Sequence, residues 1–220
     1  MTEMNFELAR HNMIEQQIRP WEVLDQRVLD LIARVPREDF VPGTYRKMAF
    51  TDMNIPLGRG QVMMSPKVEA RMLQALDVKP NETILEVGTG SGYVTALLAN
   101  LGRHVYSVEI IPEFKLGAER KLAAHDLHNV NLEVADAACG WERHGPYDVI
   151  AITGSLPLLP ESFQQSLTVG GRLFVIVGDS PVMQALLITR VGEDEWTRET
   201  LFETDLPALL NAPEPQRFVL

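Results

Sequence analysis

Three features of this 220-residue sequence predict an α/β fold whose core is a doubly wound, mostly parallel sheet. From residue 84 onward, short apolar runs alternate with stretches long enough to form crossover helices. A glycine-rich turn follows the first of these runs, and after residue 177 the runs are separated only by tight turns. The last feature predicts an antiparallel C-terminal edge. Apolar residues at helical spacing before residue 79 predict additional helices.

The individual elements follow from the positions of these runs. Parallel strands are expected at residues 84–87, 105–108, 130–134, 147–152 and 172–177. Crossover helices are expected at residues 93–101, 112–125 and 160–167, because parallel neighbours need a long, right-handed connection. Antiparallel edge strands are expected at residues 185–190, 197–202 and 217–220. Together they predict a doubly wound, Rossmann-like sheet covered by helices on both faces.

The N-terminal part of the chain has a different pattern. Apolar residues recur at helical spacing, as in Val23, Val28, Leu29 and Ile32, and prolines interrupt the pattern at intervals. We therefore divide the chain into an N-terminal helical and loop-rich region, residues 1–78, and a core, residues 79–220. Both belong to one compact domain overall, because a chain of this length can bury a single sizeable core.

Composition excludes several classes of protein. Hydrophobic residues make up 45% of the chain, which excludes a disordered protein. The 20 Lys and Arg residues against 30 Asp and Glu residues give a net charge of −10, so a nucleic-acid partner is not expected. The one cysteine, Cys139, favours a reducing, cytoplasmic compartment. The sequence shows no leader or membrane span, and the five histidines lack ligand spacing, so neither a membrane partner nor a metal is expected.

The glycine-rich turn, Gly88-Thr89-Gly90-Ser91-Gly92, follows a buried strand and opens a helix. Glycines let the backbone approach a ligand closely, while the first N–H groups of the helix point toward it. The alternative is an ordinary tight turn between a strand and a helix. The spacing G-x-G-x-G also differs from the G-x-G-x-x-G of dinucleotide-binding proteins, which makes a dehydrogenase a distant alternative.

Carboxylates at successive strand ends give this turn a candidate ligand. Glu109 ends the second strand and could accept hydrogen bonds from two ribose hydroxyls, while Asp136 follows the third strand and could accept one from an adenine amino group. Glu86 precedes the turn and suits a cation better than a pyrophosphate. These features predict an S-adenosylmethionine site formed by Glu86, Gly88, Thr89, Gly90, Ser91, Gly92, Glu109, Ile110, Ala135 and Asp136. Individually, the acids could instead be capping or solvated carboxylates.

Motifs along almost the whole chain resemble the protein-L-isoaspartate O-methyltransferase family. The segment 84–93 resembles its cofactor motif, and Val35-Pro36-Arg37-Glu38-Asp39-Phe40-Val41-Pro42 resembles its N-terminal signature. Residues 49–52 and 55–61 resemble the segment that leads into the family's active-site loop. Thr153 resembles the threonine after the fourth strand, residues 170–173 a late strand, and residues 217–219 the C-terminal strand.

The resemblance breaks in the loop where the family recognises its substrate. Family members read Gln-Thr-Ile-Ser-Gln-Pro there, whereas this chain reads Gln61-Val62-Met63-Met64-Ser65-Pro66. Both family hydroxyls are replaced, since Met64 stands at the serine position, and a thioether cannot donate a hydrogen bond. We assign residues 58–66 as the substrate loop, with Gln61, Val62, Met63, Met64 and Thr153 as substrate residues. Ser65 is the catalytic candidate, although a helix N-cap before Pro66 is the favoured role.

The resemblance implies a seven-stranded methyltransferase sheet, S-adenosylmethionine as cofactor and S-adenosylhomocysteine as product. It also implies methyl esterification of isoaspartyl carboxylates, a protein-repair reaction. Methyl transfer from a sulfonium to a carboxylate neutralises charge and needs alignment more than a strong base. Three hypotheses therefore remain. The chain could methylate a protein or peptide isoaspartyl substrate, methylate another acceptor such as a small carboxylate, or bind the cofactor as a sensor or partner module without catalysis.

Overall fold

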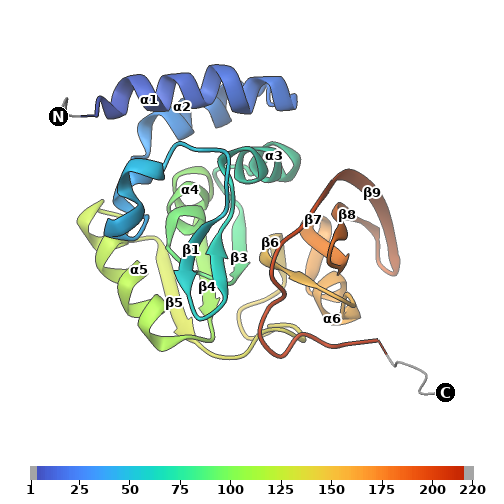
Figure 1. Ribbon diagram of the computed structural model, residues 1–220. Coiled ribbons are helices and arrows are strands. Elements are labelled where there is room, and N and C mark those ends of the chain that lie inside the picture. The colour runs from blue at the N-terminus through green and yellow to red at the C-terminus, as the bar shows by residue number, and fades with distance from the viewer. Residues whose placement is uncertain (1–3, 216–220) are drawn as a thin grey trace.

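A seven-stranded sheet forms the centre of the computed structural model, which describes residues 4–215 (Figure 1). The strands lie in the order β5-β4-β3-β6-β7-β8-β9. Neighbours from β5 to β7 pair in parallel, whereas β7 with β8 and β8 with β9 pair antiparallel. The predicted doubly wound sheet with an antiparallel edge is thus confirmed. Its strands are β3 (Thr83–Val87), β4 (His104–Glu109), β5 (Val130–Val134), β6 (Tyr147–Leu156), β7 (Leu167–Asp179), β8 (Val182–Gly192) and β9 (Glu195–Thr204).

Two hydrophobic clusters cover opposite faces of this sheet, because successive side chains of a strand point in opposite directions. Ile84 packs with the face that carries α4 (Tyr93–Leu101) and α5 (Pro112–Ala124). Its neighbour Leu85 packs with the face that carries α6 (Glu161–Gln165). The helix expected at 160–167 is shorter than predicted, since Leu167 already pairs with Tyr147 as the first residue of β7. The strand expected at 217–220 lies outside the described residues.

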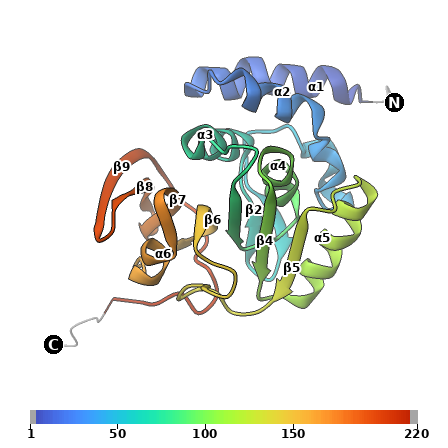
Figure 2. The ribbon, with the colours of Figure 1, turned by 180° about the vertical axis from the view of Figure 1, so that it is seen from behind.

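The N-terminal region adds further helices and one hairpin to this core. Figures 1 and 2 show α1 and α2 as the outermost layer, next to α3 and α4. The short hairpin of β1 and β2 was not predicted, because its two strands are very short. Pro56 and three turn residues in this segment also argue against a strand. The elements are α1 (Phe6–Met13), η1 (Ile14–Ile18), η2 (Arg19–Trp21), α2 (Gln26–Arg34), η3 (Arg37–Asp39), η4 (Gly43–Met48), β1 (Ile55–Gly58), β2 (Gln61–Met63) and α3 (Pro66–Leu76).

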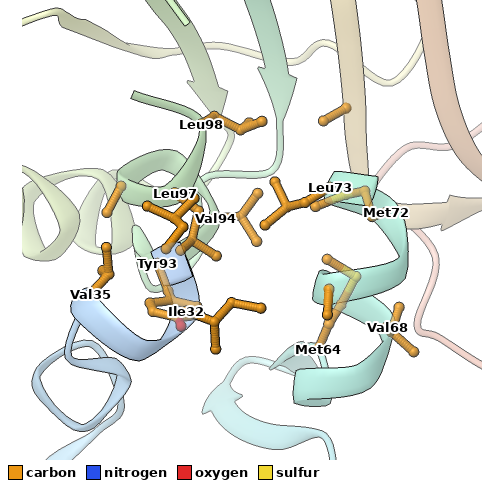
Figure 3. Packing of buried hydrophobic residues seen from close by; sticks show 14 of the residues in the cluster. Ile32, Val35, Met64, Val68, Met72, Leu73, Tyr93, Val94, Leu97 and Leu98 are labelled. Atoms are coloured by element: carbon orange, nitrogen blue, oxygen red, sulfur yellow. The ribbon is translucent and has the colours of Figure 1, made fainter. Parts of the chain in front are cut away.

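Apolar side chains join this region to the sheet. In Figure 3, Leu73 of α3 points toward Val94 and Leu97 of α4, and Ile32 of α2 lies beside them. The same cluster continues to Phe174 of β7, so one core crosses the division at residue 78. None of the helices in residues 4–215 is long and apolar enough to cross a membrane.

Candidate functional site

A pocket of about 550 Å³ opens at the carboxyl ends of β3, β4 and β6. This is the edge of a parallel sheet at which doubly wound folds bind their ligands. We call it the first pocket. It is lined by Leu57, Gln61, Val62, Val87, Gly88, Gly90, Val108, Glu109, Ile110, Ile111, Phe114, Ala135, Asp136, Ala137, Ala138, Thr153, Gly154, Leu209 and Leu210.

The glycine-rich turn has a backbone that only glycine adopts readily. Gly88, Gly90 and Gly92 have φ of +96°, +51° and +83°. A Cβ atom on Gly88 would lie 2.6 Å from Oγ1 of Thr153, and one on Gly92 would lie 2.9 Å from Cβ of Ala118. The turn therefore brings its backbone against β6 at Gly88 and against α5 at Gly92.

Glu109 lies in the first pocket at the end of β4, where the sequence analysis placed it. Its Oε2 accepts a hydrogen bond from the Gly90 amide at 2.8 Å, and its Oε1 accepts one from the Ile111 amide at 2.9 Å. The residue is only 5% exposed. Each carboxylate oxygen can accept a further hydrogen bond, so Glu109 both holds the glycine-rich turn and presents acceptors to a ligand.

Asp136 lies on the opposite wall of the first pocket and connects it to the last part of the chain. Its Oδ1 accepts a hydrogen bond from the Ala138 amide at 3.0 Å, and its Oδ2 accepts one from Nδ2 of Asn211 at 2.7 Å. Leu209 and Leu210, next to Asn211, are also lining residues. Sequence reasoning missed this contribution, because no local pattern links Asp136 with a segment 75 residues away.

Glu86, by contrast, lies beneath the glycine-rich turn and is fully buried. Its Oε2 accepts hydrogen bonds from Thr95 and Ser107, each at 2.5 Å. Ser107 in turn contacts Thr89 of the turn at 2.6 Å between hydroxyl oxygens. The structure therefore places Glu86 in a polar network that supports the turn from below, rather than with Glu109 and Asp136 in the pocket wall.

Stability should depend on pH through this buried acid. Burial raises the pKa of Glu86 to about 8, against opposing hydrogen bonds from Ser107 and Thr95. The stabilisation from keeping this group protonated is complete below its ordinary pKa and is lost as pH rises through about 8. We expect Glu86→Gln to reduce the fall in the free energy of unfolding between about pH 5 and pH 9, measured by urea denaturation. The exposed-site variant Glu119→Gln should keep the full fall, and an unchanged pH dependence in Glu86→Gln would contradict this reasoning.

A second, smaller pocket of about 270 Å³ adjoins the first. The two share Leu57, Val62, Gly88, Gly90 and Thr153, so they meet between the β1–β2 hairpin and the glycine-rich turn. The second pocket is lined by Leu57, Val62, Met63, Met64, Glu69, Gly88, Thr89, Gly90, Ser91, Val94 and Thr153. A ligand filling the first pocket would thus be adjacent to a molecule filling the second.

Most predicted substrate residues surround this junction. Gln61 lines the first pocket, Met63 and Met64 line the second, and Val62 and Thr153 line both. Oγ1 of Thr153 donates to the carbonyls of Val87 and Gly88, at 3.0 and 2.5 Å, and so supports the turn.

Ser65, the catalytic candidate, occupies a different position from these residues. It is the N-cap residue of α3 with Pro66 following, and it is buried. Its amide donates to Oδ1 of Asn54 at 3.0 Å, while its hydroxyl makes no capping bond within the described residues. The expected N-cap position is thus observed without a side-chain capping bond. Ser65 is not among the residues, within the described part of the chain, that line the first or the second pocket.

A buried ion pair next to the second pocket was not predicted. Nη1 of Arg37 contacts Oε2 of Glu69, and both side chains are at least 98% buried. Arg37 also donates through Nε to the Ala49 carbonyl at 2.8 Å and through Nη2 to the Met64 carbonyl at 2.6 Å. The signal for Glu69 was available in the sequence, because it precedes Met72 and Leu73 by three and four residues on the apolar face of α3.

Comparison with known proteins gives a consistent set of similarities. Residues 8–205 match the model of the family "Protein-L-isoaspartate(D-aspartate) O-methyltransferase (PCMT)". The chain is 38% identical over 202 residues to protein-L-isoaspartate O-methyltransferase 2 of Marinobacter nauticus, covering 91% of this chain and 92% of that protein. It is 41% identical over 171 residues to protein-L-isoaspartate O-methyltransferase of Vibrio campbellii, covering 78% and 82%.

Solved structures share the fold. A Plasmodium falciparum protein described as a protein-L-isoaspartate O-methyltransferase, in complex with S-adenosyl-L-homocysteine, superimposes with a TM-score of 0.79 at 18% identity, covering 94% of this chain and 99% of that one. A structure named protein-L-isoaspartate O-methyltransferase gives a TM-score of 0.76 at 22% identity, covering 91% and 65%. At these identities the two structures support the seven-stranded fold described above.

Proposed function

This chain belongs to the protein-L-isoaspartate(D-aspartate) O-methyltransferase family, and from that premise we propose that it methylates the free carboxylate of isoaspartyl residues in proteins or peptides, with S-adenosylmethionine as methyl donor. The observation that carries the proposal is the junction of the two pockets. One has the acceptor groups that a nucleoside requires, and the other lies directly beside it under the substrate loop.

The residues present fit this cofactor. Glu109 offers two carboxylate oxygens at the strand end where ribose hydroxyls would lie, and Asp136 offers an acceptor for an adenine amino group. Apolar side chains of Ile110, Phe114 and Leu210 complete the lining, as expected for the faces of a purine ring. Gly90 lines both pockets, and a Cβ there would lie only 3.2 Å from Leu57, so the lack of a side chain keeps this part of the lining free for the remainder of the molecule.

When bound, S-adenosylmethionine would supply an electrophilic methyl group to the acceptor oxygen, and the neutral thioether S-adenosylhomocysteine would be the leaving group. The protein's part is to hold the two reactants close, aligned and away from water, which can lower the barrier by about 7–11 kcal/mol. Glu109 and Asp136 fix the nucleoside end, and the glycine-rich turn allows close approach of the backbone. Val62 and Thr153, which line both pockets, lie at the boundary where the methyl group would pass.

Asp136→Ala is expected to weaken the affinity for S-adenosylhomocysteine by about 1–2 kcal/mol, or roughly 5- to 30-fold in Kd, because one acceptor for the purine is lost. The residue is exposed, so water compensates part of the loss. Isothermal titration calorimetry measures the effect, with Asp194→Ala in the exposed β8–β9 turn as the control. Equal affinities of both variants and the unmodified protein would remove Asp136 from the cofactor site.

The proposed activity is tested by methyl transfer from labelled S-adenosylmethionine to an isoaspartyl peptide, beside the same peptide with a normal aspartyl linkage. Calorimetric binding of S-adenosylhomocysteine is measured in parallel. We expect transfer to the isoaspartyl peptide alone. Product binding without transfer to this peptide would overturn the isoaspartyl assignment and leave another acceptor or a cofactor-binding module.

If transfer to the isoaspartyl peptide fails, the apolar substrate loop favours product binding without transfer over loss of the cofactor site. Val62, Met63 and Met64 line the second pocket without a side-chain donor, whereas the acceptors of the first pocket are all in place. A small carboxylate acceptor is therefore the second candidate. The division at residue 78 and the cytoplasmic setting favoured by the single cysteine stay predictions.

A further inference from the structure

Glu69 places a free acceptor oxygen at the second pocket. It is among the lining residues, its side chain is 2% exposed, and its Oε2 faces Arg37. Its Oε1 is buried and has no hydrogen-bond partner among residues 4–215. A buried carboxylate oxygen without a partner is costly, so a group that satisfies it is expected when the pocket is filled.

The charges around Glu69 are balanced. Arg37 of η3 is the cation that contacts it, and each of the three guanidinium nitrogens donates one hydrogen bond, to Glu69 and to the carbonyls of Ala49 and Met64. Tyr93 of α4 lies under the same guanidinium, 5.0 Å from its ring centre. The Arg10 and Glu38 side chains, paired at 2.5 Å, form the next shell. With Glu69 ionised, each buried carboxylate in this group therefore has one cation.

An acceptor carboxylate entering the second pocket would disturb this balance. Two carboxylates would then lie side by side with Arg37, the partner of Glu69, as their neighbouring cation, and like charges at one site raise the pKa of one member of the pair. The acceptor cannot be the protonated member, because methyl transfer requires its oxygen as the nucleophile. The proton therefore belongs on Glu69, whose free Oε1 can hold it.

We propose that the acceptor carboxylate binds together with one proton from solvent, and that Oε1 of Glu69 holds this proton and donates it in a hydrogen bond to the acceptor. Glu69 thus supplies the donor that Met64 and Val62 do not. Methyl transfer removes the acceptor's negative charge, and Glu69 returns its proton to solvent when the ester leaves. This inference rests on the proposed function, since it assumes a carboxylate acceptor.

The ionisation of Glu69 supports this step. Burial raises the pKa of Glu69 to about 7, although the charge and hydrogen bond of Arg37 lower it. Taking up a proton near neutral pH therefore costs little free energy, even before the acceptor arrives.

The first test is the pH dependence of kcat/KM for the isoaspartyl peptide between about pH 5.5 and pH 9. The acceptor's own carboxylate is ionised throughout, so we expect kcat/KM to fall about tenfold per pH unit above the pKa of Glu69. Glu69→Gln keeps an N–H donor that cannot titrate, so its profile should stay flat. Glu119→Gln, an exposed glutamate of α5 paired with Lys115, should keep the fall of the unmodified protein.

A second readout does not depend on turnover or on the variant folding. Calorimetry of peptide binding to the protein loaded with S-adenosylhomocysteine, in buffers of different ionisation enthalpy, should show uptake of about one proton at pH 8. A kcat/KM that rises through neutral pH, or binding without proton uptake, would overturn the inference while leaving the proposed function intact. Absence of both transfer and peptide binding at every pH would overturn both.

Discussion

Arg37→Met is expected to destabilise the protein by about 3–5 kcal/mol, because it removes one partner of a buried ion pair and leaves the Glu69 carboxyl group either charged without its cation or protonated without its hydrogen bond. The substitution also removes the hydrogen bonds to the carbonyls of Ala49 and Met64. For a chain of this size the loss corresponds to a fall of roughly 6–20 °C in Tm. Differential scanning calorimetry at neutral pH measures it directly.

Two further variants show whether the effect comes from the ion pair. Arg46→Met makes the same substitution at an arginine that pairs with Asp39 at the surface. It should reduce the free energy of unfolding by less than about 1 kcal/mol. Combining Arg37→Met with Glu69→Leu removes both charges and should recover much of the lost stability. A double variant as unstable as the single one would show that packing around Arg37, and not the charge of Glu69, causes the loss.

Glu109→Ala is expected to weaken the affinity for S-adenosylhomocysteine by about 1.5–3 kcal/mol, or roughly 10- to 150-fold in Kd. The loss exceeds that of Asp136→Ala for two structural reasons. Glu109 is almost fully buried, and its two oxygens also hold the Gly90 and Ile111 amides. The variant therefore removes the ligand's acceptor and loosens the glycine-rich turn together.

Isothermal titration calorimetry gives this affinity. Glu113→Ala is the matched control, because Glu113 lies four residues further along but extends to the surface, where it pairs with Arg59. It should bind S-adenosylhomocysteine as the unmodified protein does. Affinity retained in Glu109→Ala would remove the nucleoside assignment of the first pocket.

The sequence contained most of the information on the parallel core. The apolar runs of β3, β4, β6 and β7 contain buried residues, and the run of β5 is partly exposed. Stretches long enough for helices separate most of these runs, so the alternation predicts the strands. The β1–β2 hairpin could not be predicted in this way. Its strands are too short for a period to be read, and its turn depends on positive φ at Gly58, Arg59 and Gly60.

The sequence could locate only those candidate site residues that lie at the ends of strands. Glu109 and Asp136 lie where strands finish, and that edge is fixed by topology. The position of Glu86 beneath the turn was not predicted, because a strand residue can face either side of the sheet and the sequence does not show that Thr95 and Ser107 donate hydrogen bonds to its carboxylate. The pairing of Arg37 with Glu69 depends on the docking of α3, which no local pattern specifies.

Residues 206–211 form one wall of the first pocket, and the ribosome synthesises them after all the strands described above. Ser155 of β6 exchanges hydrogen bonds with this segment, accepting from the Leu209 amide at 2.9 Å and donating to the Pro207 and Leu206 carbonyls at 3.1 and 2.7 Å. A nascent chain that has emerged from the ribosome only as far as β9 has all the strands that the structure describes in this sheet, yet it lacks this wall. The nucleoside pocket is therefore completed after the sheet, and binding competence is a late event in the biogenesis of the protein.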